Sequence, residues 1–302
     1  MRPGITRRVE GREVSLTSLD RVLWPATGFT KGDMVDYYER VAPALLPHIA
    51  GRALTLGRFP DGVDGPGFAQ TECRGRPDWV ATAPIRLRTG ELRHYCVVDD
   101  LPSLLWVANL GSIELHPFLA RASSPSEPAA AMFDLDPEEP AGMADCARVA
   151  LRLRDVLADR GLTAVPKTSG SAGIHVVVPL NSPHTYERTR AFARSVAERL
   201  AADDSSVVAG ASRRRDRAGT VLVDWAQNSE RRSTVAPYSL RATDRPSVSA
   251  PLAWEELEEG PPPSFGPEAV LRRLERDGDR FEPALTTVQR LGGEPSAEPG
   301  GG

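Results

Sequence analysis

The amino-acid sequence predicts an α+β fold in which a central mixed or antiparallel sheet is flanked by helices, with a smaller N-terminal subregion. Two observations support this prediction. Short apolar runs rich in β-branched residues alternate with segments of helical periodicity, and several of these apolar runs end in acidic residues. The length of 302 residues suits one large folded unit better than two separate domains.

The helices are predicted from their caps and from the spacing of apolar residues. Thr30 can cap a helix together with Asp33, and apolar residues then recur every three or four positions. Residues 143–160 are strongly amphipathic, and Gly161 stands where a C-terminal cap is expected. A third helix is expected over residues 186–200. The expected strands are 55–59, 94–98, 131–136, 174–180 and 220–225.

The two ends of the chain differ in composition from the middle. Residues 1–12 are expected to be a flexible lead-in. Residues 289–302 are rich in Gly, Pro and Glu, a composition typical of disorder. We therefore place the folded domain at residues 13–288.

Composition limits the class of protein. Hydrophobic residues make up 40% of the chain and charged residues 26%, as in ordinary globular proteins. We see no apolar run of membrane-spanning length and no signal peptide, so we expect a cytoplasmic protein without a membrane partner. Cys73, Cys96 and Cys146 are far apart and form no CxxC pair. We therefore expect free thiols rather than a zinc site or disulfides.

The net charge of −4 argues mildly against nucleic-acid binding, because contacts to phosphate need positive charge. The distribution of charge leaves the question open. Basic residues gather at 213–217 and 230–232, and acidic residues at 255–259. The basic runs are consistent with a binding face and equally with ordinary solvated surface.

Asp134 and Asp136 form the sharpest local pattern. Residues two apart on a strand point to the same side, so both carboxylates project together while Leu135 faces the core. Two such carboxylates repel each other unless a cation lies between them, and oxygen-only ligands suit Mg²⁺ or Mn²⁺. A strand that simply runs into an acidic turn would contain the same residues.

Asp224 also ends a buried apolar run. Three carboxylates from neighbouring strands can hold two cations about 4 Å apart, and such a pair activates an attacking 3′-hydroxyl and stabilises a leaving pyrophosphate. The alternative interpretation of Asp224 is a strand-terminal carboxylate that accepts hydrogen bonds from backbone amides.

Residues 168–175 read TSGSAGIH. Small residues let a backbone approach a ligand closely, and exposed N–H groups can cradle phosphate. Ser169 and Ser171 add hydroxyl groups, and His175 opens the buried strand that follows. The segment is not a Walker loop, and a plain Gly-Ser turn is the alternative.

Two further residues are candidates for contact with a phosphorylated ligand. Arg241 is permanently charged and forked, which suits a triphosphate. His116 follows a short expected strand. Each of them could instead have a purely structural role.

With these residues in order, the sequence resembles the polymerase domain of bacterial ATP-dependent DNA ligase D, a member of the archaeo-eukaryotic primase superfamily. The likeness runs from about Leu16 to about Asp279. The matching stretches include FPDGVDGPGF, ANLGSIELH, FDLDP, KTSGSAGIHVVVPL, VLVDWAQN and TVAPYSLRA. The resemblance implies a primase-like fold. It also implies a template-directed nucleotidyltransferase that fills gaps and extends DNA ends in non-homologous end joining, using two Mn²⁺ or Mg²⁺ ions and NTP or dNTP.

The resemblance also implies roles for individual residues. Asp134, Asp136 and Asp224 match the metal-binding catalytic triad. Arg21 and Lys31 match basic residues that hold the 5′-phosphate at a gap or break. Phe68 matches an aromatic residue that stacks on template bases. The residues matching nucleotide contacts are Ser169, Ser171, His175, His116, Gln227 and Arg241.

The sequence departs from the family pattern near the expected triphosphate site. Ala172 replaces a residue that is usually Lys or Arg, Gly57 replaces a basic residue, and Ala69 replaces a second aromatic one. A charge-assisted contact contributes roughly 1.5–3 kcal/mol, so nucleotide affinity is expected to be about ten- to hundred-fold lower than in a typical member. Arg214 and Arg217 could compensate in part.

Three hypotheses follow. The first is an active polymerase, and the second a catalytically weak or inactive protein that binds 5′-phosphorylated DNA breaks. A metal-dependent nuclease or phosphohydrolase, the third, fits the carboxylates alone. We see no ligase or phosphoesterase motif, so the resemblance implies a stand-alone, nucleoid-associated domain. Its expected partners are gapped or broken DNA, the Ku protein and a separate ATP-dependent DNA ligase.

Overall fold

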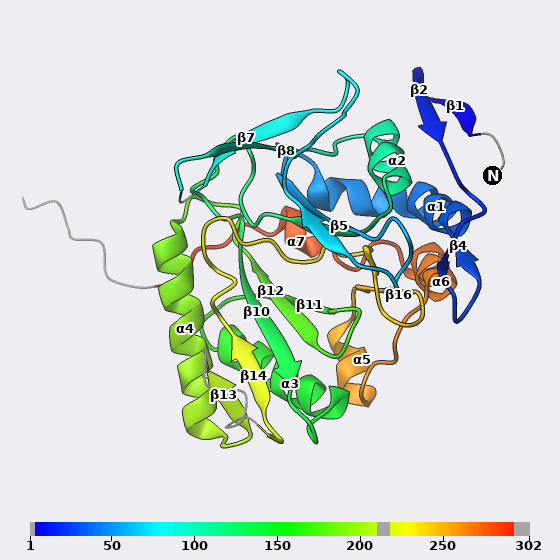
Figure 1. The fold of residues 1–302 in the computed structure, drawn as a ribbon. Coiled ribbons are helices and arrows are strands. Elements are labelled where there is room, and N and C mark those ends of the chain that lie inside the picture. Colours follow the sequence, from blue (N-terminus) through cyan, green and yellow to red (C-terminus); the bar gives the residue numbers. More distant parts are fainter. Residues whose placement is uncertain (1–3, 88, 210–217, 293–302) are drawn as a thin grey trace, which may run out of the picture.

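The structure is a computed structural model, and it describes residues 4–87, 89–209 and 218–292 (Figure 1). The basic run at 213–217, with Arg214 and Arg217, lies outside the described residues, as do residues 293–302 of the expected tail. No helix in the described part of the chain has the length and apolar character needed to cross a membrane.

Two five-stranded sheets organise the molecule, where the sequence predicted one central sheet (Figure 1). The first sheet is antiparallel, with strand order β6-β5-β8-β7 and with β9 paired to β5. Its strands are β5 (Leu54–Arg58), β6 (Phe68–Gln70), β7 (Thr82–Arg86), β8 (Leu92–Cys96) and β9 (Ser112–Pro117).

The second sheet has the strand order β11-β12-β10-β14-β13. It is mixed, because β13 and β14 run parallel while the other pairs are antiparallel. Its strands are β10 (Ala130–Pro137), β11 (Val165–Thr168), β12 (Ile174–Pro179), β13 (Val207–Ala209) and β14 (Val221–Asp224). The predicted α+β class with a mixed or antiparallel sheet is therefore confirmed.

Helices cover the two sheets separately (Figure 1). The helices α3 (Met143–Ala158) and α4 (Tyr186–Asp203) contact the second sheet, whereas α1 (Lys31–Ile49) and α2 (Leu101–Asn109) pack against each other beside the first. The remaining helices are α5 (Trp254–Glu259), α6 (Pro267–Asp277) and α7 (Pro283–Thr286). The short strands are β1 (Ile5–Val9), β2 (Arg12–Leu16), β3 (Val22–Trp24), β4 (Phe29–Thr30), β15 (Leu240–Arg241) and β16 (Ser247–Val248).

The predicted cap of α1 is confirmed. Thr30 Oγ1 accepts a hydrogen bond from the Asp33 amide at 3.1 Å, and the Thr30 amide donates to the Asp33 carboxylate at 2.7 Å. This reciprocal pair satisfies two amide groups that would otherwise lack partners at the start of the helix. Lys31 is consequently fixed in the first turn of α1.

Alternation along β10 gives the second sheet one face that is buried under helices and one face that carries acidic side chains. Phe133 and Leu135 are fully buried on the face covered by the helices. Asp134 and Asp136 therefore project from the opposite face, as the sequence predicted.

Residues 5–12 lie in a β-hairpin, whereas the sequence analysis expected a flexible lead-in over residues 1–12. Ile5–Val9 pairs with Arg12–Leu16 as an antiparallel hairpin, and Val9, Val14 and Leu16 are buried. At the other end, the side chain of Gln289 donates to the Pro179 carbonyl at 2.6 Å. Composition alone does not reveal short strands of this kind, because a strand with one apolar face can be held in place while its other residues stay polar.

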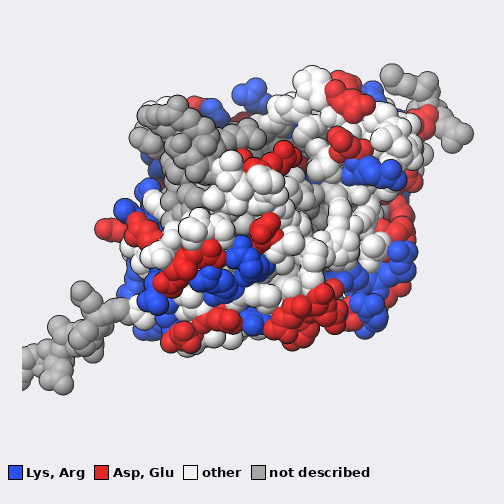
Figure 2. All heavy atoms as spheres, turned by 90° about the horizontal axis from the view of Figure 1, so that it is seen from below, with Lys and Arg blue, Asp and Glu red and all other residues white. Residues whose placement is uncertain are grey.

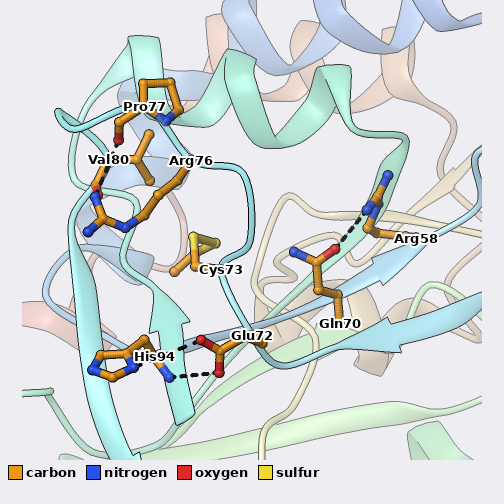
Figure 3. The surroundings of a disulfide bond; sticks show 9 residues. Arg58, Gln70, Glu72, Cys73, Arg76, Pro77, Val80 and His94 are labelled. Carbon is orange, nitrogen blue, oxygen red and sulfur yellow. Dashed lines mark hydrogen bonds and ion pairs between the residues drawn. A yellow bond between two sulfur atoms is a disulfide. The ribbon is translucent and has the colours of Figure 1, made fainter.

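The expectation of three free cysteines is wrong for two of them. Cys73 and Cys96 form a disulfide, with their Cα atoms 4.9 Å apart (Figure 3). The Cys73 amide donates to the His94 carbonyl at 2.7 Å, which holds the segment after β6 against β8. This proximity arises from the sheet and is not visible in the spacing of 23 residues. Cys146 is a buried free thiol, as expected.

Charge on the surface is mixed. On the face seen from below, acidic and basic residues are interspersed rather than gathered into an area of one sign (Figure 2). This pattern agrees with the small net charge of −4. Any contact with a polyanion on this face therefore depends on local groups rather than on an overall field.

Candidate active site

A single row of residues crosses four strands of the second sheet. Lys167 of β11 is the register partner of His175 in β12, which is the partner of Asp134 in β10. Asp134 is in turn the partner of Asp224 in β14. Residues directly opposite each other across antiparallel strands share a face, as do residues two apart along a strand. The sheet therefore brings Asp134, Asp136 and Asp224 to one face.

Asp134 has an ionised and partly unsatisfied carboxylate. Burial raises its pKa, but the nearby His175, Lys167 and Arg241 side chains outweigh burial and hold the pKa below its ordinary value. His175 Nε2 lies 3.1 Å from Oδ1 of Asp134. This contact is an ion pair and not a hydrogen bond, and in the described structure Oδ1 is buried without a hydrogen-bond partner. An unsatisfied buried carboxylate oxygen is the kind of group that a cation would stabilise.

The carboxylates share a face without forming a ready-made metal site. Within residues 4–87, 89–209 and 218–292, no group of three His, Cys, Asp or Glu side chains is placed to hold a metal ion. Asp224 Oδ1 accepts a hydrogen bond from the Ala226 amide at 2.7 Å, which is the alternative role that the sequence left open. The chemistry of Asp134, Asp136 and Asp224 still suits Mn²⁺ or Mg²⁺, because their ligand atoms are all carboxylate oxygens. One of these oxygens, Oδ1 of Asp134, has no hydrogen-bond partner in the described structure.

The Gly-Ser loop after β11 is organised by Ser169. Its hydroxyl oxygen accepts from the amides of Ser171 at 3.2 Å and Gly173 at 3.0 Å. These two amides, expected to be available for phosphate, are therefore already used. The hydroxyl proton of Ser169 remains available for donation. Gly173 lies so close to β10 that an added Cβ would be 2.2 Å from the Leu135 carbonyl oxygen, so only glycine fits here.

Arg241 joins this loop to the first sheet. Its Nε donates to Glu114 Oε1 at 2.9 Å, and its Nη1 donates to the Ser169 carbonyl at 2.5 Å. Oε2 of Glu114 lies 2.8 Å from Nε2 of His116, on the same strand β9. The structure thus brings Arg241, His116 and Ser169, all predicted from sequence, into one cluster around a carboxylate.

Glu114 is the residue of this cluster that the sequence analysis did not single out. Burial raises the pKa of its carboxyl, but the His116 hydrogen bond, the Arg241 charge and the Ala242 amide together lower it to about 2. The signal was present in the sequence, since Glu114 and His116 are two apart on a strand and share a face. Gly57 lies opposite Glu114 in β5, and an added Cβ there would be 2.8 Å from the Glu114 Cβ.

A second cluster combines positive charge with an exposed aromatic ring. Lys31 Nζ donates to the Thr17 carbonyl at 2.7 Å. Burial, followed by the charges of Arg21 and Arg58, lowers the pKa of Lys31 to about 8. The Arg58 guanidinium lies 5.3 Å from the ring centroid of Phe68, whose side chain is 49% exposed. Arg58 also donates to Gln70 at 2.7 Å (Figure 3).

The turn after β14 is fixed by Asn228. This fully buried side chain accepts from the Met132 amide at 2.8 Å and donates to the Met132 carbonyl at 2.6 Å. Gln227, the remaining predicted nucleotide contact, precedes Asn228 and is half-buried. The segment that carries Gln227 is therefore tied to β10, the strand of Asp134 and Asp136.

Comparison with known proteins agrees with this arrangement. The family described as "LigD, primase-polymerase domain" matches residues 30–281. The Multifunctional non-homologous end joining DNA repair protein LigD of Mycobacterium tuberculosis is 41% identical over 280 residues, which cover 90% of this chain and 37% of that protein. The Bifunctional non-homologous end joining protein LigD of Bacillus subtilis is 30% identical over 272 residues, which cover 89% of this chain and 44% of that protein.

The chain therefore spans less than half the length of these relatives. A solved structure entitled "Polymerase Domain from Mycobacterium tuberculosis Ligase D in complex with DNA" matches with a TM-score of 0.86 and 39% sequence identity. The match covers 91% of this chain and 99% of that one. The family match over most of the sequence and this likeness of fold lead to one conclusion: the chain belongs to the LigD primase-polymerase domain family.

Proposed function

We propose that this chain is a template-directed nucleotidyltransferase that fills gaps and extends DNA ends in non-homologous end joining. The observation that supports this most directly is the cross-strand pairing of Asp134 with Asp224, with Asp136 on the same face. The solved domain that the chain resembles is in complex with DNA. The proposed partners are DNA with gaps or breaks, the Ku protein and an ATP-dependent DNA ligase.

Asp134, Asp136 and Asp224 would hold two Mn²⁺ or Mg²⁺ ions. Bound ions of this kind would neutralise charge on the triphosphate and increase the reactivity of a primer 3′-hydroxyl. The orphaned Oδ1 of Asp134 supports this assignment, because its lone pairs are not used by any described donor. The lowered pKa of Asp134 keeps the carboxylate ionised and ready for a cation.

The remaining candidate residues would bind and orient the incoming NTP or dNTP. Arg241 supplies a permanent positive charge held in place by Glu114. Ser169 can donate its hydroxyl proton to a phosphate oxygen, while its oxygen holds the loop in shape. Ser171, His175, His116 and Gln227 complete the proposed nucleotide contacts.

The cluster around Lys31 would hold the 5′-phosphate at the far side of a gap. An ammonium beside two guanidinium groups is repelled by them, and a bound phosphate would relieve that repulsion. Phe68 is exposed, so its ring is free to stack on a template base without regard to sequence. We assign Arg21 and Lys31 to phosphate binding and Phe68 to template stacking.

A primer-extension assay tests this function. The substrate is a gapped duplex with a 5′-phosphate, supplied with Mn²⁺ and either NTP or dNTP. Wild type should add one or a few nucleotides, and Asp136→Ala should abolish addition while DNA binding persists. Asp155→Ala, which removes an exposed carboxylate of α3, is the matched control and should extend normally. Full extension by Asp136→Ala would show that the metal assignment is wrong.

One observation supports a second candidate function, that of a weakly active or inactive DNA-end binder. Ala172 is exposed on the Gly-Ser loop and carries no charge, and Gly57 contributes none. Tight binding to phosphorylated ends without measurable extension would favour this candidate. Shortening of the primer would instead identify a nuclease.

A further inference from the structure

Two buried hydroxyl groups lie between the strand of Glu114 and the strand of Arg241. Tyr38 of α1 and Ser239, which precedes β15, are both 0% exposed, and their hydroxyl oxygens are 3.5 Å apart. Both hydroxyls bond to backbone groups of β9 and β15. Because neither side chain reaches the surface, any effect that they have on a ligand must pass through these backbone groups.

The hydroxyl of Tyr38 joins the residue before Glu114 to the residue before Arg241. It donates to the Ile113 carbonyl at 2.5 Å and accepts from the Leu240 amide at 3.2 Å. Burial raises the pKa of Tyr38, so the hydroxyl keeps the proton that it donates. A single oxygen atom therefore bridges the two backbones next to the residues that form the ion pair.

The hydroxyl of Ser239 makes a second connection, on the other side of Glu114. It accepts from the Leu115 amide at 2.9 Å and donates to the Leu240 carbonyl at 3.0 Å. Glu114 is thus flanked by two residues, Ile113 and Leu115, whose backbone groups are bonded to buried hydroxyls.

These hydroxyls take the place of a ladder between the two strands. Among the described residues, β15 pairs with β16 and β9 pairs with β5, but no ladder joins β15 to β9. A backbone hydrogen bond of 2.8 Å runs from the Ala236 amide to the Leu115 carbonyl, before β15 begins. Buried backbone groups need partners, and beyond that point the side-chain hydroxyls supply them.

The contacts around Glu114 depend on the distance between these strands. The side chain of Arg241 and the amide of Ala242 both donate to Oε1 of Glu114, at 2.9 and 3.0 Å. Hydrogen bonds weaken as donor and acceptor move apart or lose their alignment. A displacement of β15 relative to β9 would therefore loosen both contacts at once.

We propose that these two hydroxyls hold β15 beside β9 and so align Arg241 with Glu114. Tyr38 and Ser239 are thus positioning residues that act through the backbone. The consequence for the nucleotide rests on the proposed function, whereas the alignment itself does not. A group that is already ordered binds its ligand without the cost of being ordered at that moment. Loss of either hydroxyl should therefore weaken nucleotide binding more than it slows the chemical step.

Amide hydrogen exchange followed by NMR tests the alignment without nucleotide or metal. In wild type the amides of Leu240 and Ala242 should be protected. In Tyr38→Phe, which removes only the hydroxyl, both should exchange about tenfold faster, while the Phe133 amide in the second sheet keeps its rate. Equal acceleration at Phe133 would indicate a general loss of stability and would overturn the proposal.

Two further outcomes would contradict the alignment. A wild-type Leu240 amide that exchanges as fast as an exposed amide would overturn the proposal even if Tyr38→Phe failed to fold. So would a folded Tyr38→Phe with wild-type rates. Ser239→Ala tests the other hydroxyl, and its Leu115 and Ala242 amides should exchange faster than in wild type. Unchanged rates there would remove the role of Ser239.

Tyr37→Phe is the matched control. Tyr37 precedes Tyr38 in α1, is also buried, and donates its hydroxyl proton to the Tyr238 carbonyl at 2.7 Å. The substitution removes a buried hydrogen bond of the same kind, but not one that reaches β9. Tm should fall and the Ala242 amide should keep its rate. A loss of protection as large as in Tyr38→Phe would mean that any missing hydroxyl behind this loop has the effect, and the specific role of Tyr38 would be lost.

Single-nucleotide incorporation on gapped DNA with Mn²⁺ supplies a second readout. Tyr38→Phe should raise KM for the nucleotide about tenfold with kcat nearly unchanged, because a binding contact is lost while the carboxylates of the metal site are kept. Tyr37→Phe should keep the wild-type KM at a temperature where it is fully folded. A merely structural role of Tyr38 would lower Tm and leave KM as it is.

The two readouts separate the failure of this inference from the failure of the proposed function. If wild type does not extend primers but the amides of Leu240 and Ala242 behave as expected, the proposed function fails and the positioning role stands. If wild type extends primers and a folded Tyr38→Phe has the wild-type KM, the consequence for the nucleotide is overturned.

Discussion

Arg241 of β15 donates a 2.9 Å hydrogen bond from its Nε to Oε1 of Glu114. Glu114 belongs to β9 of the first sheet, and Arg241 also donates to the carbonyl of Ser169 in the second sheet's Gly-Ser loop. Arg241 thus links the Gly-Ser loop to the half-buried carboxylate of Glu114 in the first sheet.

Glu114→Gln should weaken nucleotide binding. The amide keeps the shape of the side chain but loses the charge that holds Arg241, a loss of about 2 kcal/mol for a charge-assisted hydrogen bond. We expect KM for the nucleotide to rise by more than tenfold and Tm to fall. Glu268→Gln, at an exposed ion pair with Arg40, should change neither quantity measurably. Wild-type KM in Glu114→Gln would contradict the assignment of Arg241.

Affinity for a 5′-phosphate should depend on pH through Lys31. Because the pKa of this lysine is lowered to about 8, the amine is charged below that value and loses its charge as pH rises through it. Bound phosphate favours the charged form, so the fall in affinity is expected at and above that pH. The measurement is fluorescence anisotropy with gapped DNA, with and without the phosphate. The advantage of the phosphate should be smaller and independent of pH in Lys31→Met, and equal pH profiles would refute the assignment.

Phe68→Ala should weaken binding to the template strand. Stacking of a base on an aromatic ring contributes about 1–3 kcal/mol, and the exposed ring gives little to folding. Affinity for gapped DNA should fall about five- to hundred-fold with Tm unchanged. Leu92→Ala removes a comparably exposed apolar side chain in the same sheet and should leave DNA affinity intact. Equal losses in both variants would point to a general surface effect.

Ala172→Lys should strengthen nucleotide binding. Ala172 is exposed on the Gly-Ser loop, so a longer side chain can be accommodated there without displacing the core. One new charge-assisted contact to the triphosphate is expected to lower KM about tenfold. Ala158→Lys, at the exposed end of α3, adds the same charge away from the cleft and serves as control. A similar gain in the control would indicate long-range attraction rather than direct contact.

Reduction of the bond between Cys73 and Cys96 should destabilise the first sheet. A cross-link closing a loop of this size typically contributes about 3 kcal/mol to the free energy of unfolding. Denaturant titration with and without reductant measures the effect. The double variant Cys73→Ser with Cys96→Ser should unfold like the reduced wild type and should not respond to reductant. A response in the double variant would implicate Cys146 instead.

Much of the candidate site could be predicted from the sequence, because strand periodicity determines which side chains share a face. The pattern at Asp134 and Asp136, and the acid at the end of the Asp224 strand, placed three carboxylates that the structure brings to one face of one sheet. Local chemistry also gave the cap at Thr30. These features depend on residues that are neighbours along the chain or in one ladder.

The features that the sequence analysis did not predict depend on contacts between segments that are distant in the sequence. Lys167 looks like an ordinary strand residue until its register partner His175 is known. Cys73 meets Cys96 only because the segment after β6 lies against β8, and cysteine spacing carries no information about that. Glu114 is the exception, since its position two residues before His116 was visible and its importance was not recognised.

The close approach of Gly57 to Glu114 limits which side chains could be introduced next to the Arg241 cluster. A basic side chain introduced at Gly57 would have to displace the side chain of Glu114, which anchors Arg241, because even an added Cβ would lie 2.8 Å from the Glu114 Cβ. Adding charge at Ala172 has no such conflict, since that position is open to solvent. The two missing basic side chains are therefore not equivalent. The charge at position 172 can be restored by a single substitution, whereas a charge at position 57 also requires a change at Glu114.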